Sequence, residues 1–130
     1  MTNTLRRSTS LGAFLAYSLS PAMLFADVNL TSRWDMMMNP NFKGQRAIED
    51  CRIKQEKQTL LVRCGGAGAE MRGEVNGWDV WWRYILPDGV VVSWQGKLDK
   101  TATRIDGKWQ FVLTDGSKQS GKFSATKHRN

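Results

Sequence analysis

The stretch from Val80 to Trp94, VWWRYILPDGVVVSW, decides the fold. Apolar side chains recur at every second residue on both sides of a Pro-Asp-Gly turn, which indicates the two strands of a β-hairpin. A hairpin has to place apolar partners on one face of the sheet, and a three-residue loop at Pro87–Gly89 does so, with Gly89 in the left-handed conformation. The pairs predicted on this inner face are Leu86 with Val90, Tyr84 with Val92, and Trp82 with Trp94.

The rest of the chain continues this pattern as a meander of short strands. The turn pairs that separate them are Asn76-Gly77, Asp88-Gly89, Asp106-Gly107 and Asp115-Gly116. Counting Leu30–Met38 as the first strand, we expect about eight or nine antiparallel strands and no helix of any length. Closure into an up-and-down β-barrel hides the sheet edges most simply, so the predicted class is all-β with a single small barrel. A two-sheet sandwich is the alternative.

Further inward rows follow from the same alternation of side chains along each strand. The residues expected to face inward on the outermost strands are Trp34, Met36, Met38, Trp109, Phe111, Leu113, Phe123 and Ala125. At Asn76-Gly77 a two-residue loop pairs Val75 with Trp78 and Met71 with Trp82, so both tryptophans are predicted inside. Trp81 then points outward. The partners predicted on this outer face are Arg72 for Trp81 and Glu70 for Arg83.

The first 26 residues are typical of a secretory signal peptide. Arg6 and Arg7 precede a nine-residue apolar run and a segment that ends in small residues. Nine apolar residues are far fewer than the roughly 20 that span a bilayer, so no transmembrane segment is expected after cleavage. Cleavage after Ala22 or after Ala26 fits the small-residue rule. We therefore expect a periplasmic or secreted protein with a signal peptide at residues 1–26 and a β-barrel domain at 27–130.

Two cysteines, Cys51 and Cys64, lie in the mature domain. An exported chain enters an oxidising compartment, so a disulfide between them is the expected state. They are symmetric about Lys57 and Gln58, which places them opposite each other on one hairpin. Two cysteines and a single histidine, His128 in the polar tail, make a poor metal site, so no metal or other cofactor is expected and the tail histidine is expected to be solvated.

The charge of the mature domain is positive but scattered along the sequence. Without Arg6 and Arg7, 17 of the 19 lysines and arginines remain against 12 acids, which gives +5. Because no run of cations stands out, a nucleic-acid interface is not predicted. A modest attraction to anionic envelope surfaces is all that this charge implies.

The order of several short motifs resembles small exported bacterial proteins with lipocalin-like or avidin-like barrels. The motifs are Leu30–Trp34, Gly73–Gly77, Trp94–Gly96 and Gly121–Lys127. In lipocalin-like proteins a Gly-x-Trp near the first strand closes the barrel floor, with a basic residue from the last strand on the ring. The resemblance implies this role for Trp34, with Ser32 in the place of the glycine and Lys127 or Arg129 as the cation. No biotin-contacting residue of avidin is carried over.

Neither paired catalytic carboxylates nor a nucleophile beside a base can be recognised, so an enzyme is not expected and no catalytic residue is assigned. Two functional hypotheses follow. In the first, the barrel interior binds a small apolar or amphipathic molecule, unless its own side chains fill it. The candidate ligand-binding residues are Trp82, Tyr84, Trp94, Trp109 and Phe111. In the alternative, an outer patch of Trp81, Arg72 and Arg83 docks a protein or glycan of the cell envelope. The oligomeric state is left open.

Overall fold

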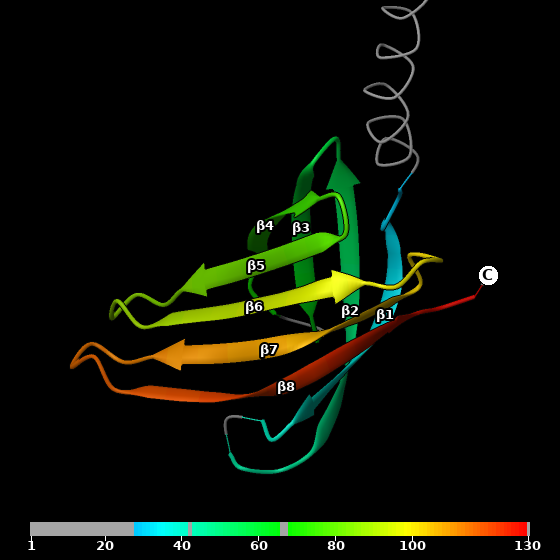
Figure 1. The fold of residues 1–130 in the computed structure, drawn as a ribbon. Coiled ribbons are helices and arrows are strands. Elements are labelled where there is room, and N and C mark those ends of the chain that lie inside the picture. The colour runs from blue at the N-terminus through cyan, green and yellow to red at the C-terminus, as the bar shows by residue number, and fades with distance from the viewer. Residues whose placement is uncertain (1–27, 42, 66–67, 130) are drawn as a thin grey trace, which may run out of the picture.

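The computed structural model describes residues 28–41, 43–65 and 68–129, and in these the chain is an eight-stranded antiparallel barrel (Figure 1). The strands are β1 (Ser32–Asn39), β2 (Ala47–Glu56), β3 (Thr59–Cys64), β4 (Met71–Asn76), β5 (Asp79–Ile85), β6 (Val91–Leu98), β7 (Arg104–Val112) and β8 (Lys118–Lys127). Each strand pairs with its neighbours in sequence, and β1 pairs with β8 to close the sheet. The predicted up-and-down barrel is confirmed, and the sandwich alternative is wrong.

The predicted signal peptide, residues 1–26, lies outside the described residues. Within the described part of the chain there is no helix long and apolar enough to span a bilayer.

The hairpin β5–β6 has the predicted register. Trp82 lies opposite Trp94, and Tyr84 lies opposite Val92. The Leu86 amide donates to the Val90 carbonyl oxygen at 2.8 Å, which closes the expected three-residue loop. Gly89 has a φ of 91°, so the left-handed position is filled by the residue that adopts it without strain.

The hairpin β2–β3 also has the predicted register, with Ile53 opposite Val62 and Cys51 opposite Cys64. The two cysteines form the expected disulfide. Cys51 is fully buried in the barrel core, whereas Cys64 is half-buried near the end of β3. The bridge therefore ties two adjacent strands at the point where the chain leaves the sheet for the loop to β4.

The register predicted for β4–β5 is wrong by two residues. Asn76 lies opposite Asp79 and Val75 opposite Val80, so Trp78 lies in the turn and is 39% exposed instead of facing inward. Alternation alone could not separate the two registers, because a shift of two residues keeps every side chain on its face. The observed register places Trp82 opposite Gly73, where an added Cβ would come within 2.6 Å of the Trp82 Cα. Only glycine fits this close strand contact.

The predicted turn at Asp106-Gly107 is also wrong, because both residues lie inside β7. Gly107 lies opposite Gly96 of β6, and a Cβ on Gly107 would come within 2.5 Å of the Gly96 Cα. The turn between β6 and β7 is instead organised by Asp99, whose Oδ1 accepts hydrogen bonds from the Thr103 and Arg104 amides at 3.0 and 3.2 Å. Partial desolvation works to raise the pKa of Asp99, but these bonds outweigh it and hold the pKa below its usual range.

The core of the barrel consists almost entirely of the predicted inward rows. Trp34, Trp82 and Trp109 are the largest of its fully buried side chains. Met36 and Met38 face inward with Trp34, while Met37 is only half-buried on the other face. The Trp82 ring contacts aromatic rings from two other strands inside the barrel. It stacks on Trp94 of β6 and makes an edge contact with Phe123 of β8, with ring centroids 5.7 Å apart.

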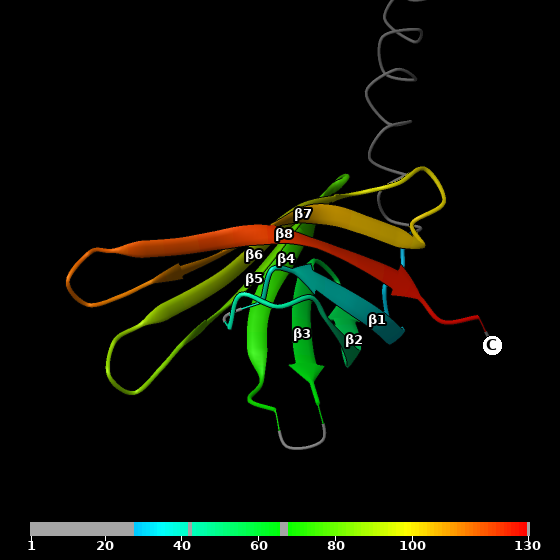
Figure 2. The ribbon, with the colours of Figure 1, turned by 90° about the horizontal axis from the view of Figure 1, so that it is seen from below.

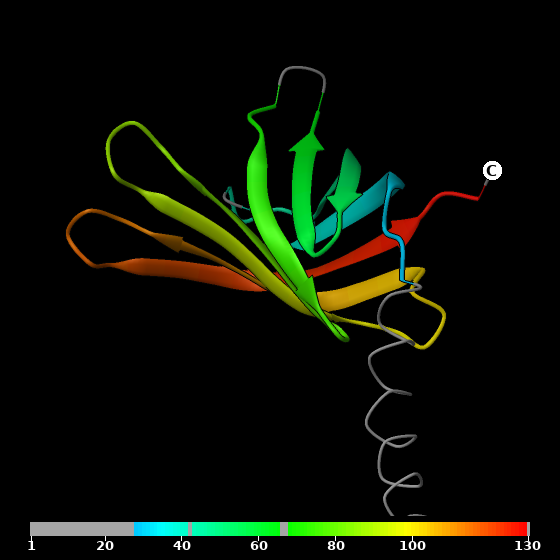
Figure 3. The same ribbon diagram turned by 90° about the horizontal axis from the view of Figure 1, so that it is seen from above.

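The two ends of the barrel differ. At the end that holds the turns β2–β3, β4–β5 and β6–β7, Leu30 and Trp34 are fully buried, and the Trp34 indole donates to the Leu30 carbonyl oxygen at 2.9 Å. Lys127 lies opposite Trp34 and donates to the Asn29 carbonyl oxygen at 3.0 Å. Figures 2 and 3 show that the hairpins β3–β4, β5–β6 and β7–β8 diverge at the other end. One end is thus sealed, and the other is open.

The disulfide gives a test of the β2–β3 register. We expect the double variant Cys51→Ala/Cys64→Ala to lose at most about 3 kcal/mol of unfolding free energy, because the bridge closes a short loop that the hairpin already brings together. Urea unfolding of the oxidised protein and of the variant measures this difference. Two reactive thiols in the native oxidised protein would contradict the assignment.

Candidate functional site

The open end of the barrel contains an apolar hollow of about 340 Å³. Its lining residues are Cys64, Ala69, Met71, Tyr84, Leu86, Val92, Trp94 and Phe111. They come from β3 to β7 and from the loops at this end. The volume lies within the range of small-molecule sites, and the lining has the composition of such sites, which is apolar with few polar groups. This hollow is the candidate functional site.

The structure brings three of the five predicted ligand-binding residues to this hollow. Tyr84, Trp94 and Phe111 line it. Tyr84 supplies the polar group, because its ring is half-buried and its hydroxyl bonds to no other described residue. Trp94 is 6% exposed, and this small exposed area belongs to the wall of the hollow.

Trp82 and Trp109 do not line the hollow, so their contact with a ligand stays a prediction that this cavity does not support. Trp82 is fully buried one ring layer behind Trp94, with ring centroids 6.4 Å apart. Its Nε1 is buried and has no hydrogen-bond partner among the described residues. The Trp109 indole donates to the Pro40 carbonyl oxygen at 2.6 Å, and Gly121 lies opposite it on β8. Both rings fill the middle of the barrel, which is the outcome expected of large aromatics in a small barrel.

The prediction missed several lining residues. Cys64, Ala69 and Leu86 lie where a strand ends or a loop begins. Alternation predicts which face a strand residue occupies, but it does not indicate where neighbouring hairpins separate. Met71 and Val92 were expected to face inward, but no sequence pattern indicated that the cavity would reach them. The Gly65–Gly68 stretch, which marks the break between β3 and β4, was the one available signal.

The predicted outer patch around Trp81 is rearranged by the β4–β5 register. Arg72 lies opposite Arg83, and Glu74 lies opposite Trp81, so the predicted Arg72–Trp81 and Glu70–Arg83 pairs are wrong. Arg83, on the same strand as Trp81, places its guanidinium 5.7 Å from the ring centroid. Trp81 is half-buried rather than exposed. An arginine stem that covers a tryptophan ring is the usual structural arrangement.

The expectation that His128 is merely solvated is wrong, since its Nε2 lies 2.8 Å from Asp35 Oδ1. Asp50 lies beside them, and these three side chains form a possible metal-ligand group. However, Arg33 donates to Asp50 Oδ2 at 2.9 Å and holds the pKa of Asp50 below its usual range. A cation would have to displace this guanidinium. We therefore assign this cluster to the attachment of the C-terminal segment to β1 and β2.

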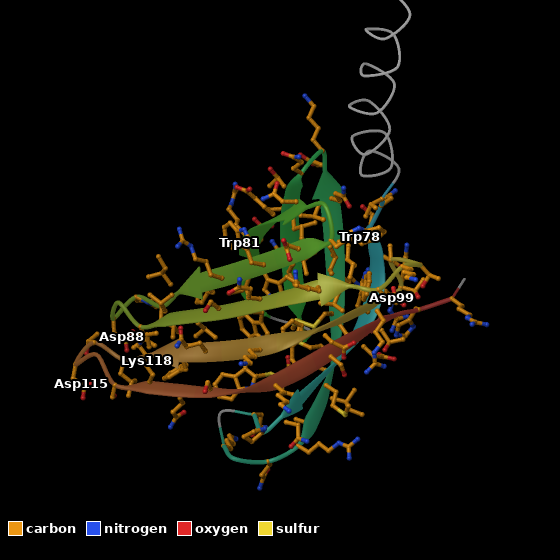
Figure 4. The ribbon with its side chains drawn as sticks, viewed as in Figure 1. Trp78, Trp81, Asp88, Asp99, Asp115 and Lys118 are labelled. Carbon is orange, nitrogen blue, oxygen red and sulfur yellow. A yellow bond between two sulfur atoms is a disulfide. The ribbon has the colours of Figure 1, made fainter. Side chains whose placement is uncertain are left out.

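The remaining acids that the sequence placed at turns fulfil that role in part. Asp88 accepts a hydrogen bond from the Val90 amide at 3.1 Å, and Asp115 accepts bonds from the Ser117 hydroxyl and amide. The Ser117 bonds lower the pKa of Asp115. Figure 4 shows Asp88 and Asp115 at the tips of the open-end hairpins, and Trp78 and Asp99 at the opposite end. The two tip acids stabilise the hairpins that border the hollow.

Comparisons with known proteins place the chain near few others. No protein-family profile matches the sequence, and no curated protein gives a significant match. Among solved structures, the chain is similar to the vaccine antigen Transferrin Binding Protein B (TbpB) from Haemophilus parasuis Hp5, with a TM-score of 0.41 and 12% sequence identity. The similarity covers 75% of this chain and 25% of that chain. The chain thus spans about a quarter of the length of that protein.

The observed β4–β5 register and the contact between Arg83 and Trp81 lead to a prediction about Trp81. In double-mutant cycles, we expect Trp81→Ala and Arg83→Ala to couple by about 0.5–1 kcal/mol, because the guanidinium lies over the ring. The matched cycle of Trp81→Ala with Arg72→Ala should give a coupling near zero. Urea unfolding of the single and double variants provides both values. A larger coupling with Arg72 would restore the predicted register.

Proposed function

We propose that this chain is an exported, non-enzymatic binding protein that holds a small apolar or amphipathic molecule at the open end of its barrel. The single observation that carries the proposal is the hollow of about 340 Å³ beside a packed core. A barrel of eight strands can be filled by its own side chains or can hold one small ligand. Here tryptophans fill the middle and the sealed end, and the open end keeps a cavity.

The chemistry of the lining supports an amphipathic ligand in particular. Met71, Leu86 and Val92 offer apolar surface, and the ring of Phe111 adds an aromatic wall. The Tyr84 hydroxyl offers one hydrogen bond to a polar group of the ligand, which would fix its orientation. None of the described residues that line this cavity is charged, so a ligand that carries a charge would have to keep that group in solvent at the open end.

The proposal also includes export of the chain and a binding role without catalysis. The disulfide between Cys51 and Cys64 supports an oxidising compartment. In the sequence, the apolar run and the small residues of 1–26 support export by a signal peptide. A lipocalin-like role as a carrier fits a barrel with one sealed and one open end. The alternative, docking through Trp81, is less favoured because Arg83 already covers that ring.

The test uses 11-(dansylamino)undecanoic acid as an amphipathic probe and the tryptophan emission of the protein as energy donor. We expect saturable dansyl emission on excitation of tryptophan, with one probe bound per chain, because Trp94 lines the hollow. Ala69→Trp places a large side chain at the exposed edge of the cavity, so probe affinity should fall at least tenfold while the unfolding free energy stays nearly unchanged.

The matched control is Lys118→Trp, which adds the same side chain at the same end of the barrel but outside the cavity (Figure 4). This variant should bind the probe as the original protein does. Absence of saturable binding, or equal affinity in the Ala69→Trp variant, would overturn the proposal.

A further inference from the structure

A second candidate site lies on the outer face of the barrel, away from the hollow. Arg33 of β1 lies directly opposite Arg52 of β2, and Arg52 lies directly opposite Arg63 of β3. Because adjacent strands are about 4.8 Å apart, the three side chains start from backbone positions within roughly 10 Å. The cations appear scattered along the sequence, but the strand register gathers these three into one row.

The row borders an outer hollow of about 650 Å³. Among the described residues, four cationic side chains line it, those of Arg33, Arg52, Lys54 and Arg63, together with one acid, Glu70. Half-buried Leu61 lies among them and gives the hollow an apolar surface. Arg72 is the neighbour of Leu61 on β4, which extends the positive charge beyond the hollow.

The internal ion pairs leave this charge incompletely balanced. Arg33 pairs with Asp50 at 2.9 Å, Lys54 with Glu56 at 3.3 Å and Arg63 with Glu70 at 3.3 Å, and all six side chains are at least one-third exposed. Exposed pairs of this kind contribute little and exchange easily with other anions. Arg52, between the other two arginines, has no ion-pair partner among the described residues. Like charges directly opposite each other destabilise a sheet, so the row has a cost that the exposed pairs with Asp50 and Glu70 only reduce.

We propose that this outer hollow binds a linear anionic polysaccharide, with Arg52 as its central contact. Guanidinium groups form paired hydrogen bonds with sulfate, phosphate or carboxylate groups, and a row of three suits a chain that presents such groups at intervals. Leu61 provides an apolar surface for the C–H face of a sugar ring. A lipid bilayer is flat and fits a concave surface poorly, and an inorganic polyanion makes no use of the apolar surface. This site goes beyond the interior ligand and does not depend on it.

The test measures the affinity of the full mature protein for size-defined dextran sulfate, with neutral dextran of the same size as the reference. We expect Arg52→Gln to weaken dextran sulfate binding about tenfold, since charged hydrogen bonds of this type are lost. The unfolding free energy of this variant should be unchanged or higher, because repulsion within the row is relieved. A purely structural arginine would instead lower stability on substitution.

The matched control is Lys108→Gln, which removes the same charge from exposed Lys108 on β7. It should change the affinity less than twofold. Equal weakening by both variants would mean attraction to net charge alone, and would overturn the proposal, as would failure of dextran sulfate to bind. Binding of phosphatidylglycerol vesicles that depends on Arg52, without binding of dextran sulfate, would overturn it in favour of a membrane surface. The Ala69→Trp variant should bind dextran sulfate normally.

Discussion

Pairing between β1 and β8 removes the two free edges that an eight-stranded sheet of this length would otherwise expose. It also sets the core, because Met36 comes opposite Ala125 and Met38 opposite Phe123 on the inner face. Phe123 then reaches the edge of the Trp82 ring, which belongs to β5 in the opposite wall. Closure of the sheet and packing of the core therefore depend on each other.

The proposed function rests on the uneven filling of this closed sheet. Tryptophan rings occupy the middle, and Leu30 with Trp34 seals one end, so the space that remains lies between the diverging hairpins of the other end. The outer face of the barrel is in contact with water, so each strand presents polar side chains there. On β1 to β3 those side chains include three arginines in register, Arg33, Arg52 and Arg63. The two proposed contacts therefore differ in kind, one with an apolar or amphipathic molecule within the open end and one with an anionic chain on the wall.

Alternation of side chains was enough to predict the barrel, the β5–β6 register and the disulfide, because each depends on which face a residue occupies. It failed at Trp78 and at the Arg72–Trp81 pair, since two registers that differ by two residues place the same side chains on the same faces. The choice between them rests on Gly73 opposite Trp82, a steric fit that appears only in three dimensions. The hollow was foreseen through Tyr84, Trp94 and Phe111, but not its loop residues. The arginine row depends also on the register between β1 and β2, which alternation did not predict.

Amide hydrogen exchange measured by NMR along β1 tests the closed barrel most directly. In an antiparallel sheet, alternate amides of β1 bond to β2 and to β8, so the account predicts slow exchange at every amide from Trp34 to Met38. Protection there should match that of the central strands β5 and β6. If every second amide of β1 exchanged at the rate of an unfolded chain, β1 would be an edge strand, and the closure on which the core, the sealed end and the hollow depend would be contradicted.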